Sequence, residues 1–134
     1  MDRNKLEKAR MTQKLIRDLA DRADKLLTKD NLSSEIVALR SITINLNDVM
    51  IRDLIQSCET EDKELKELLE KIEVNMRAID NILALLNASN VENGKKHVHL
   101  WYKFYADALD NKLKKYEEVT KEQATEEQTI DEQI

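Results

Sequence analysis

The chain has 134 residues, one glycine and no proline, and 37% of its residues are charged while 4% are aromatic. This balance is typical of packed helices and excludes a sheet-rich fold, so we expect an all-α protein with one domain. The net charge of −5, with no basic stripe that carries stacking aromatic residues, excludes the usual pattern of a nucleic-acid-binding protein.

The sequence also indicates where the protein resides. No apolar run approaches the ~20 residues that cross a bilayer, so we expect no membrane contact. The N-terminus is charged from Asp2 onward, unlike a signal peptide. Cys58 is the only cysteine, which leaves no internal disulfide and suits a reducing compartment. We therefore expect a soluble, cytoplasmic protein.

The first helix is expected over residues 3–29, where apolar residues recur every three or four positions. Gln13 is the one polar residue in this stripe. The second helix is expected from about Ser34 to Ser57. Its apolar residues cover a wide arc of a helical wheel: Ile36, Leu39, Ile42, Ile44, Leu46, Val49, Ile51 and Ile55. So wide an arc predicts either a central place in the bundle or contact with another subunit.

The link between the second and third helices is open to two interpretations, because residues 58–62 contain neither glycine nor proline. Thr60 as an N-cap, followed by acidic residues, predicts a break, and we favour it. The alternative is one coiled-coil-like rod from Ser34 to Leu86 in a protein of three helices. The third helix, over Glu61–Leu86, has the most regular stripe: Leu65, Leu68, Ile72, Met76, Ile79, Leu83 and Leu86.

A turn at Asn87–Gly94 precedes the fourth helix, which is expected over Lys95 to about Val119. Its main stripe is Val98, Tyr102, Tyr105, Leu109, Leu113 and Tyr116. Residues 120–134 are polar and acidic and lack the apolar surface that would offset the entropy of ordering. We therefore expect an antiparallel bundle of about four helices in residues 1–119, followed by a disordered, flexible acidic tail.

Residues suited to catalysis or metal binding are sparse. His97 and His99, two apart, point to opposite sides of a helix and so do not ligate one ion together. A ladder of acidic residues alternates with lysines, as on a solvated face: Glu61, Glu64, Glu67, Glu70 and Glu73. No glycine-rich phosphate loop is present. We expect no enzyme, no metal and no cofactor. The remaining alternative is a metal-dependent all-α phosphohydrolase built from the carboxylates.

One group of apolar residues departs from the stripes. Leu100 and Phe104 project opposite the main face of the fourth helix, and two residues of the third helix also leave its stripe. A short antiparallel turn brings them to one end of the molecule. Either the fold covers this end, with Leu26, Leu27 and Leu32 packed over it, or the end is exposed and binds a partner. The candidate partner-binding residues are Ile82, Leu85, Val91, Leu100, Trp101 and Phe104.

These patterns favour a non-enzymatic protein–protein interaction module, such as an adaptor, an assembly subunit or a small regulator. Its partner would be another protein, a second copy of the chain, or both. The alternative function is a small phage or mobile-element inhibitor or chaperone that binds a host protein, because such proteins share this composition.

From Leu69 to Tyr105, the segments LEKI, NMRAIDNILALLNAS and LWYKFY resemble in spacing a small Dad subunit of the fungal DASH spindle–kinetochore ring. The resemblance covers under a third of the chain and leaves residues 1–60 unmatched. No residue role or function is therefore carried over from it.

Overall fold

The computed structural model describes residues 3–26, 33–88 and 92–133, and within them the side chains of residues 3–26, 34–86 and 94–119. Its helices are α1 (Arg3–Lys25), α2 (Ser33–Asn45), α3 (Arg52–Ser57), α4 (Lys63–Ala88) and α5 (Glu92–Gln133). A π-helical segment, Leu46–Ile51, joins α2 to α3, and a 3-10 turn, Thr60–Asp62, leads into α4. Among the described residues only Cys58 and Glu59 lie outside a helical segment, so the all-α prediction is confirmed.

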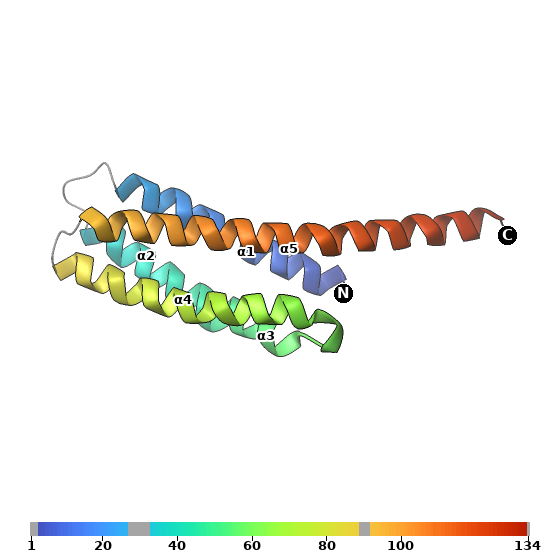
Figure 1. Cartoon of the computed structure of the whole chain (residues 1–134), viewed down its shortest axis with the longest axis horizontal. Helices are drawn as coiled ribbons and strands as arrows, with labels where there is room; N and C mark the ends of the chain where they lie inside the picture. The colour runs from blue at the N-terminus through green and yellow to red at the C-terminus, as the bar shows by residue number, and fades with distance from the viewer. Residues whose placement is uncertain (1–2, 27–32, 89–91, 134) are drawn as a thin grey trace.

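The helices form an antiparallel bundle (Figure 1). If α2, the π-helical segment and α3 are taken as one helix, the described residues make four helices, as predicted. α1 lies beside α5, while α2 and α3 lie beside α4. Each helix runs opposite to the next one along the chain, so α4 and α5 are antiparallel neighbours.

The helix α5 continues to Gln133, well past the helix end expected near Val119. In Figure 1 its last part extends beyond the other helices, outside the bundle. The division into a bundle domain of residues 1–119 and a flexible acidic tail of residues 120–134 stays a prediction.

The chain reverses between α3 and α4, so the predicted break is present and the single rod from Ser34 to Leu86 is wrong. Cys58 is extended, with φ −69° and ψ 132°, and ends α3. The N-cap is Glu59 rather than the predicted Thr60. The shift by one residue arises because the Asp62 carboxylate accepts a hydrogen bond from the Glu59 amide at 3.2 Å, the geometry of a capping box.

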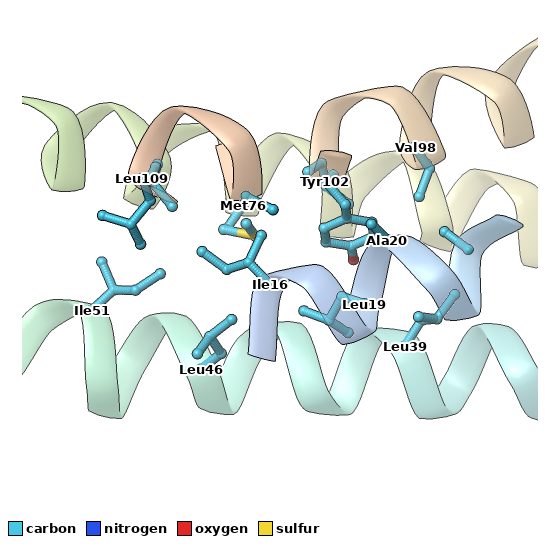
Figure 2. Packing of buried hydrophobic residues seen from close by; sticks show 14 of the residues in the cluster. Ile16, Leu19, Ala20, Leu39, Leu46, Ile51, Met76, Val98, Tyr102 and Leu109 are labelled. Carbon is cyan, nitrogen blue, oxygen red and sulfur yellow. The ribbon is translucent and has the colours of Figure 1, made fainter. Parts of the chain in front are cut away.

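The core runs along the axis of the bundle and is built from the predicted stripes (Figure 2). In α4, Leu69 is buried and the predicted Leu68 is only half-buried. The other predicted residues of the α4 stripe are buried: Leu65, Ile72, Met76, Ile79, Leu83 and Leu86. In α5, Val98, Tyr102, Leu109 and Leu113 are buried together with Ala106, whereas Tyr105 and Tyr116 lie at the edge of the core.

The π-helical segment changes which residues of the second helix face the core. Leu46 and Ile51 are both buried although they lie five residues apart, and the polar Asn47 between them is buried as well. In an α-helix a step of five would turn a side chain far from its predecessor, but the wider π-helical turn keeps both on one side. Val49, expected in the apolar arc that meets neighbouring helices, is instead 65% exposed.

Candidate functional site

The antiparallel pairing of α4 with α5 creates the surface of interest. The first turn of α5 approaches the last turn of α4 closely, because Gly94 faces Leu86 there. A Cβ atom added to Gly94 would lie 2.9 Å from Leu86 Cδ2, closer than such atoms normally come. The single glycine of the chain therefore lets the two helices meet at this end of the bundle.

The predicted partner-binding residues fall into three groups in the structure. Leu85, Leu100 and Phe104 are exposed, with 66%, 55% and 63% of their surfaces open to solvent. Ile82 and Trp101 are half-buried and pack against the edge of the core. Val91 lies outside the described residues. We call the surface formed by Ile82, Leu85, Leu100, Trp101 and Phe104 the α4–α5 face.

The other interpretation, in which the fold covers this end, placed Leu26, Leu27 and Leu32 over the patch. Leu26 is buried in the core. Leu27 and Leu32 lie outside the described residues. The solvent exposure of Leu85, Leu100 and Phe104 favours the interpretation of an open surface.

Aromatic rings give the α4–α5 face a defined shape. Phe104 meets Tyr105 edge to face, with ring centroids 5.1 Å apart and an interplanar angle of 88°. The His97 and Trp101 rings lie 6.1 Å apart. His99 points elsewhere, toward α1, where its Nδ1 lies 3.0 Å from the Ala20 carbonyl oxygen. The two histidines therefore diverge, as their spacing predicted.

Most of the charge near the α4–α5 face is positive, and the acidic Asp107, one turn after Phe104, pairs with Arg17 of α1. Residues 81–88 of α4 carry no charged side chain, and residues 93–106 of α5 contain lysines but no aspartate or glutamate. Lys96 and Lys103 are exposed beside Leu100 and Phe104, whereas Lys95 is buried. A partner with acidic residues would complement this surface.

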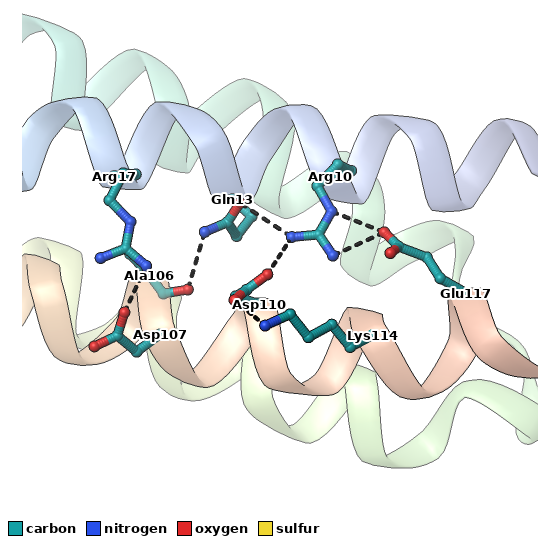
Figure 3. Close-up of polar contacts among 8 residues, drawn as sticks. All are labelled: Arg10, Gln13, Arg17, Ala106, Asp107, Asp110, Lys114 and Glu117. Atoms are coloured by element: carbon teal, nitrogen blue, oxygen red, sulfur yellow. Dashed lines mark hydrogen bonds and ion pairs between the residues drawn. The ribbon is translucent and has the colours of Figure 1, made fainter.

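Polar contacts with α1 hold α5 in a fixed rotation (Figure 3). Arg10 bonds Asp110 at 2.6 Å and Glu117 at 2.8 Å. Gln13, the polar residue in the α1 stripe, donates to the Ala106 carbonyl oxygen at 3.2 Å. The Arg10 guanidinium lowers the pKa of Asp110 below its ordinary value. Because the inner side of α5 is bound in this way, Leu100 and Phe104 on its opposite side face solvent.

The candidate catalytic and metal-binding residues lie apart or are already paired. No group of three His, Cys, Asp or Glu residues in the described part of the chain has the arrangement of a metal site. Within the acidic ladder, Glu64 pairs with Lys112 at 3.0 Å and Glu73 with Arg77 at 2.9 Å. Burial raises the pKa of the half-buried Cys58 thiol, which disfavours its reactive thiolate form.

A shallow groove of about 360 Å³ lies between α2 and α4 beside the π-helical segment. Asp48 and Asp80 line it, and Asp80 already accepts a bond from Arg40 at 2.9 Å. Asn47 also lines the groove, but its Oδ1 atom is buried and has no hydrogen-bond partner. A ligand in this groove could not reach that oxygen without a movement of the surrounding side chains.

Within the described residues, no helix combines the length and the apolar character that a membrane crossing requires. Comparison of the chain with protein-family models, with curated proteins and with solved structures returns no match. The resemblance to a Dad subunit therefore gains no support, and the functional argument rests on the surface alone.

Proposed function

We propose that this protein is a non-enzymatic protein–protein interaction module that binds its partner through the α4–α5 face. The observation that carries the proposal is the exposure of Leu85, Leu100 and Phe104 at one end of the bundle. Three large apolar side chains at the same end, flanked by half-buried Ile82 and Trp101, are typical of an interaction surface rather than of scattered exposed residues.

The energetics support the proposal. Complete burial of one exposed leucine or phenylalanine contributes about 1.5–3 kcal/mol, so a partner that covers the α4–α5 face gains several such increments. Trp101 and Phe104 are of the aromatic type that often dominates binding energy. The lysines beside them would steer an acidic partner toward the surface and exclude a basic one.

Affinity capture from the source cell, with wild-type and variant chains compared side by side, tests the proposal. In the first variant, Leu100→Glu is combined with Phe104→Glu. Because both side chains are exposed, we expect its helicity by circular dichroism to match that of the wild type, while partner capture is lost. The matched control combines Val37→Glu with Val49→Glu, which adds the same charges at two exposed apolar positions of the second helix, outside the α4–α5 face. We expect the control to retain the partner.

Two results would contradict the proposal. The first is capture of the same proteins by the Leu100→Glu, Phe104→Glu variant and the wild type. The second is unfolding of that variant, which would mean that these side chains contribute to the core. An adaptor and an inhibitor of a host protein would use the same surface, and the identity of the captured protein separates these two functions.

A further inference from the structure

We propose that the occupant of the α4–α5 face is the acidic C-terminal part of α5 from a second copy of the chain, so that the protein forms an antiparallel homodimer. This inference rests on the proposed function, because it uses the same surface and names its partner. It draws on the charge distribution along α5, on the length of that helix and on the position of its exposed apolar residues.

The two ends of α5 carry opposite charge. From Glu92 to residue 106 the helix contains one acidic residue, Glu92, and three lysines, of which Lys96 and Lys103 are exposed and Lys95 is buried. From residue 120 to residue 133 it contains one lysine and five acidic residues: Glu122, Glu126, Glu127, Asp131 and Glu132. Two α5 helices placed antiparallel therefore set the acidic half of each against the basic half of the other. Opposite charges at such positions favour that orientation over the parallel one.

The length of α5 excludes the same chain as the source of the acidic half that covers the α4–α5 face. A continuous helix rises about 1.5 Å per residue, so residue 126 stands about 39 Å along the axis from Leu100. A straight helix cannot fold back on itself, and the α4–α5 face of the same chain is out of reach of its own acidic half. In Figure 1 the end of α5 extends away from the bundle rather than along it.

A second copy would stabilise the projecting part of α5 as a helix. The sequence of this part has few apolar residues, and such a stretch does not hold a helix by its own propensity. The helix from residue 120 to residue 133 spans about 21 Å, long enough to cover the stretch of about 16 Å from Gly94 to Phe104. A second copy supplies a surface of the right length and of opposite charge.

One exposed apolar residue, Val119, lies further along α5 on the side of the α4–α5 face. Val119 is 52% exposed. It follows the half-buried Ala108 by eleven residues, an interval that keeps two residues on the same side of an α-helix. In the sequence, Ile130 follows Val119 at the same interval. Ala108 lies one turn after Phe104, so this side of the helix runs on from the α4–α5 face.

The resulting interface is self-complementary, as a two-fold symmetric dimer requires. The midpoint between the basic and acidic halves is residue 113, so the two-fold axis would pass close to the exposed Asn111, two residues away. Each contact between the halves then occurs twice, so any single substitution acts twice on the stability of the dimer.

Mass measurement by light scattering, combined with charge reversal in the full chain, tests the inference. We expect the wild type to have twice the 15.6 kDa mass of one chain at low salt, and to dissociate as salt rises. The basic-half variant, Lys96→Glu with Lys103→Glu, and the acidic-half variant, Glu122→Lys with Glu126→Lys, should each have the mass of one chain. When the two variants are mixed, opposite charges face each other again, and we expect the double mass to return.

A matched control reverses two exposed lysines of α4, Lys63→Glu with Lys66→Glu, and should keep the double mass. The inference is overturned if the wild type has the mass of one chain at submillimolar concentration, if both variants keep the double mass, or if their mixture does not regain it. The proposed function fails separately. Suppose that the wild type is monomeric and captures a protein that the Leu100→Glu, Phe104→Glu variant does not capture. The α4–α5 face would then be an interaction surface, and only the second copy as its occupant would be rejected.

Discussion

The hydroxyl oxygens of Thr43 and Tyr102 lie 2.5 Å apart in the middle of the core, one from α2 and the other from α5. Thr43 also donates its only hydroxyl proton to the Leu39 carbonyl oxygen at 2.6 Å. Tyr102 must therefore be the donor in the bond between the two hydroxyl groups. This bond joins two helices that do not follow one another in the sequence, and it fixes their relative position along the bundle axis.

The direction of this bond predicts an asymmetry between two substitutions. Tyr102→Phe removes the donor but leaves the Thr43 hydroxyl bonded to Leu39, so we expect the free energy of unfolding to fall by about 0.5–1.5 kcal/mol. Thr43→Val keeps the shape of the side chain but leaves the buried Tyr102 hydroxyl without an acceptor, at a cost of about 1–3 kcal/mol. Urea unfolding of both variants measures the difference. Equal losses, or a larger loss for Tyr102→Phe, would contradict the assignment of Tyr102 as donor.

Burial of Tyr102 also predicts sensitivity to alkaline pH. Desolvation raises the pKa of its hydroxyl above the ordinary value of 10.0. Above pH 10 the unfolded chain releases this proton while the folded chain retains it, so deprotonation favours unfolding. We expect the free energy of unfolding to fall by up to about 1.4 kcal/mol per pH unit in this range.

In the Tyr102→Phe variant this alkaline slope should become shallower, as measured by urea unfolding at a series of pH values. Burial also raises the pKa values of Tyr105 and Tyr116, which are less buried, so a smaller slope should remain. An unchanged slope in the variant would mean that Tyr102 ionises normally in the folded chain.

The regular helices could be predicted closely from the sequence, because their apolar residues follow one constant period. Six of the seven predicted stripe residues of α4 and four of the six of α5 are buried, and Tyr105 and Tyr116 lie at the edge of the core. The buried face of the second helix could not be predicted as closely, because a helical wheel assumes the same rotation at every residue. The π-helical segment from Leu46 to Ile51 changes that rotation, and Val49 consequently faces solvent.

The candidate surface could be placed but its exposure could not be predicted. Helical phase alone puts Leu100 and Phe104 opposite the main stripe of α5. Whether a neighbouring segment covers them depends on packing between parts of the chain that are distant in sequence. The contacts of Arg10 with Asp110 and Glu117 could not be predicted for the same reason, because they depend on the register between α1 and α5. Only the polar Gln13 within an apolar stripe signalled a buried contact there.

The ion pair of Lys5 with Asp62 predicts sensitivity to acid. The two side chains lie 3.1 Å apart and are almost buried. Burial raises the pKa of Asp62, but bonds from the Glu59 amide and from Lys5 outweigh that effect and hold the pKa below the ordinary value of 3.8. The stability that this carboxylate contributes is therefore present above pH 3.8 and is lost as the pH falls through the lower, folded-state pKa.

Asp62→Asn removes the charge and should reduce the free energy of unfolding at neutral pH by about 1–3 kcal/mol, because Lys5 loses its anionic partner. The variant should also lose less stability than the wild type as the pH falls below 3.8. Glu64→Gln is the matched control, since Glu64 bonds Lys112 on an exposed surface where an ion pair contributes little. Urea unfolding at neutral and acid pH measures both variants, and equal effects would contradict a special role for Asp62.

The buried Asn47 amide predicts a substitution that stabilises the protein. Its Nδ2 atom donates to the Glu73 carbonyl oxygen at a long 3.3 Å, while its Oδ1 atom is buried without a hydrogen-bond partner. An apolar side chain of similar size removes that unpaired oxygen and gives up only a weak bond. Asn47→Leu should therefore raise the free energy of unfolding by about 1 kcal/mol, measured by urea unfolding.

The control is Asn75→Leu, because the half-buried Asn75 donates to the Lys71 carbonyl oxygen at 2.8 Å in an exposed hydrogen bond, so no buried unpaired atom is removed there. We expect no comparable gain from it. A loss of stability in Asn47→Leu would mean that the Oδ1 atom has a partner such as an ordered water molecule, since removing a satisfied buried acceptor costs free energy. The amide would then be a fixed polar contact of the π-helical segment, and the groove beside it would hold bound water.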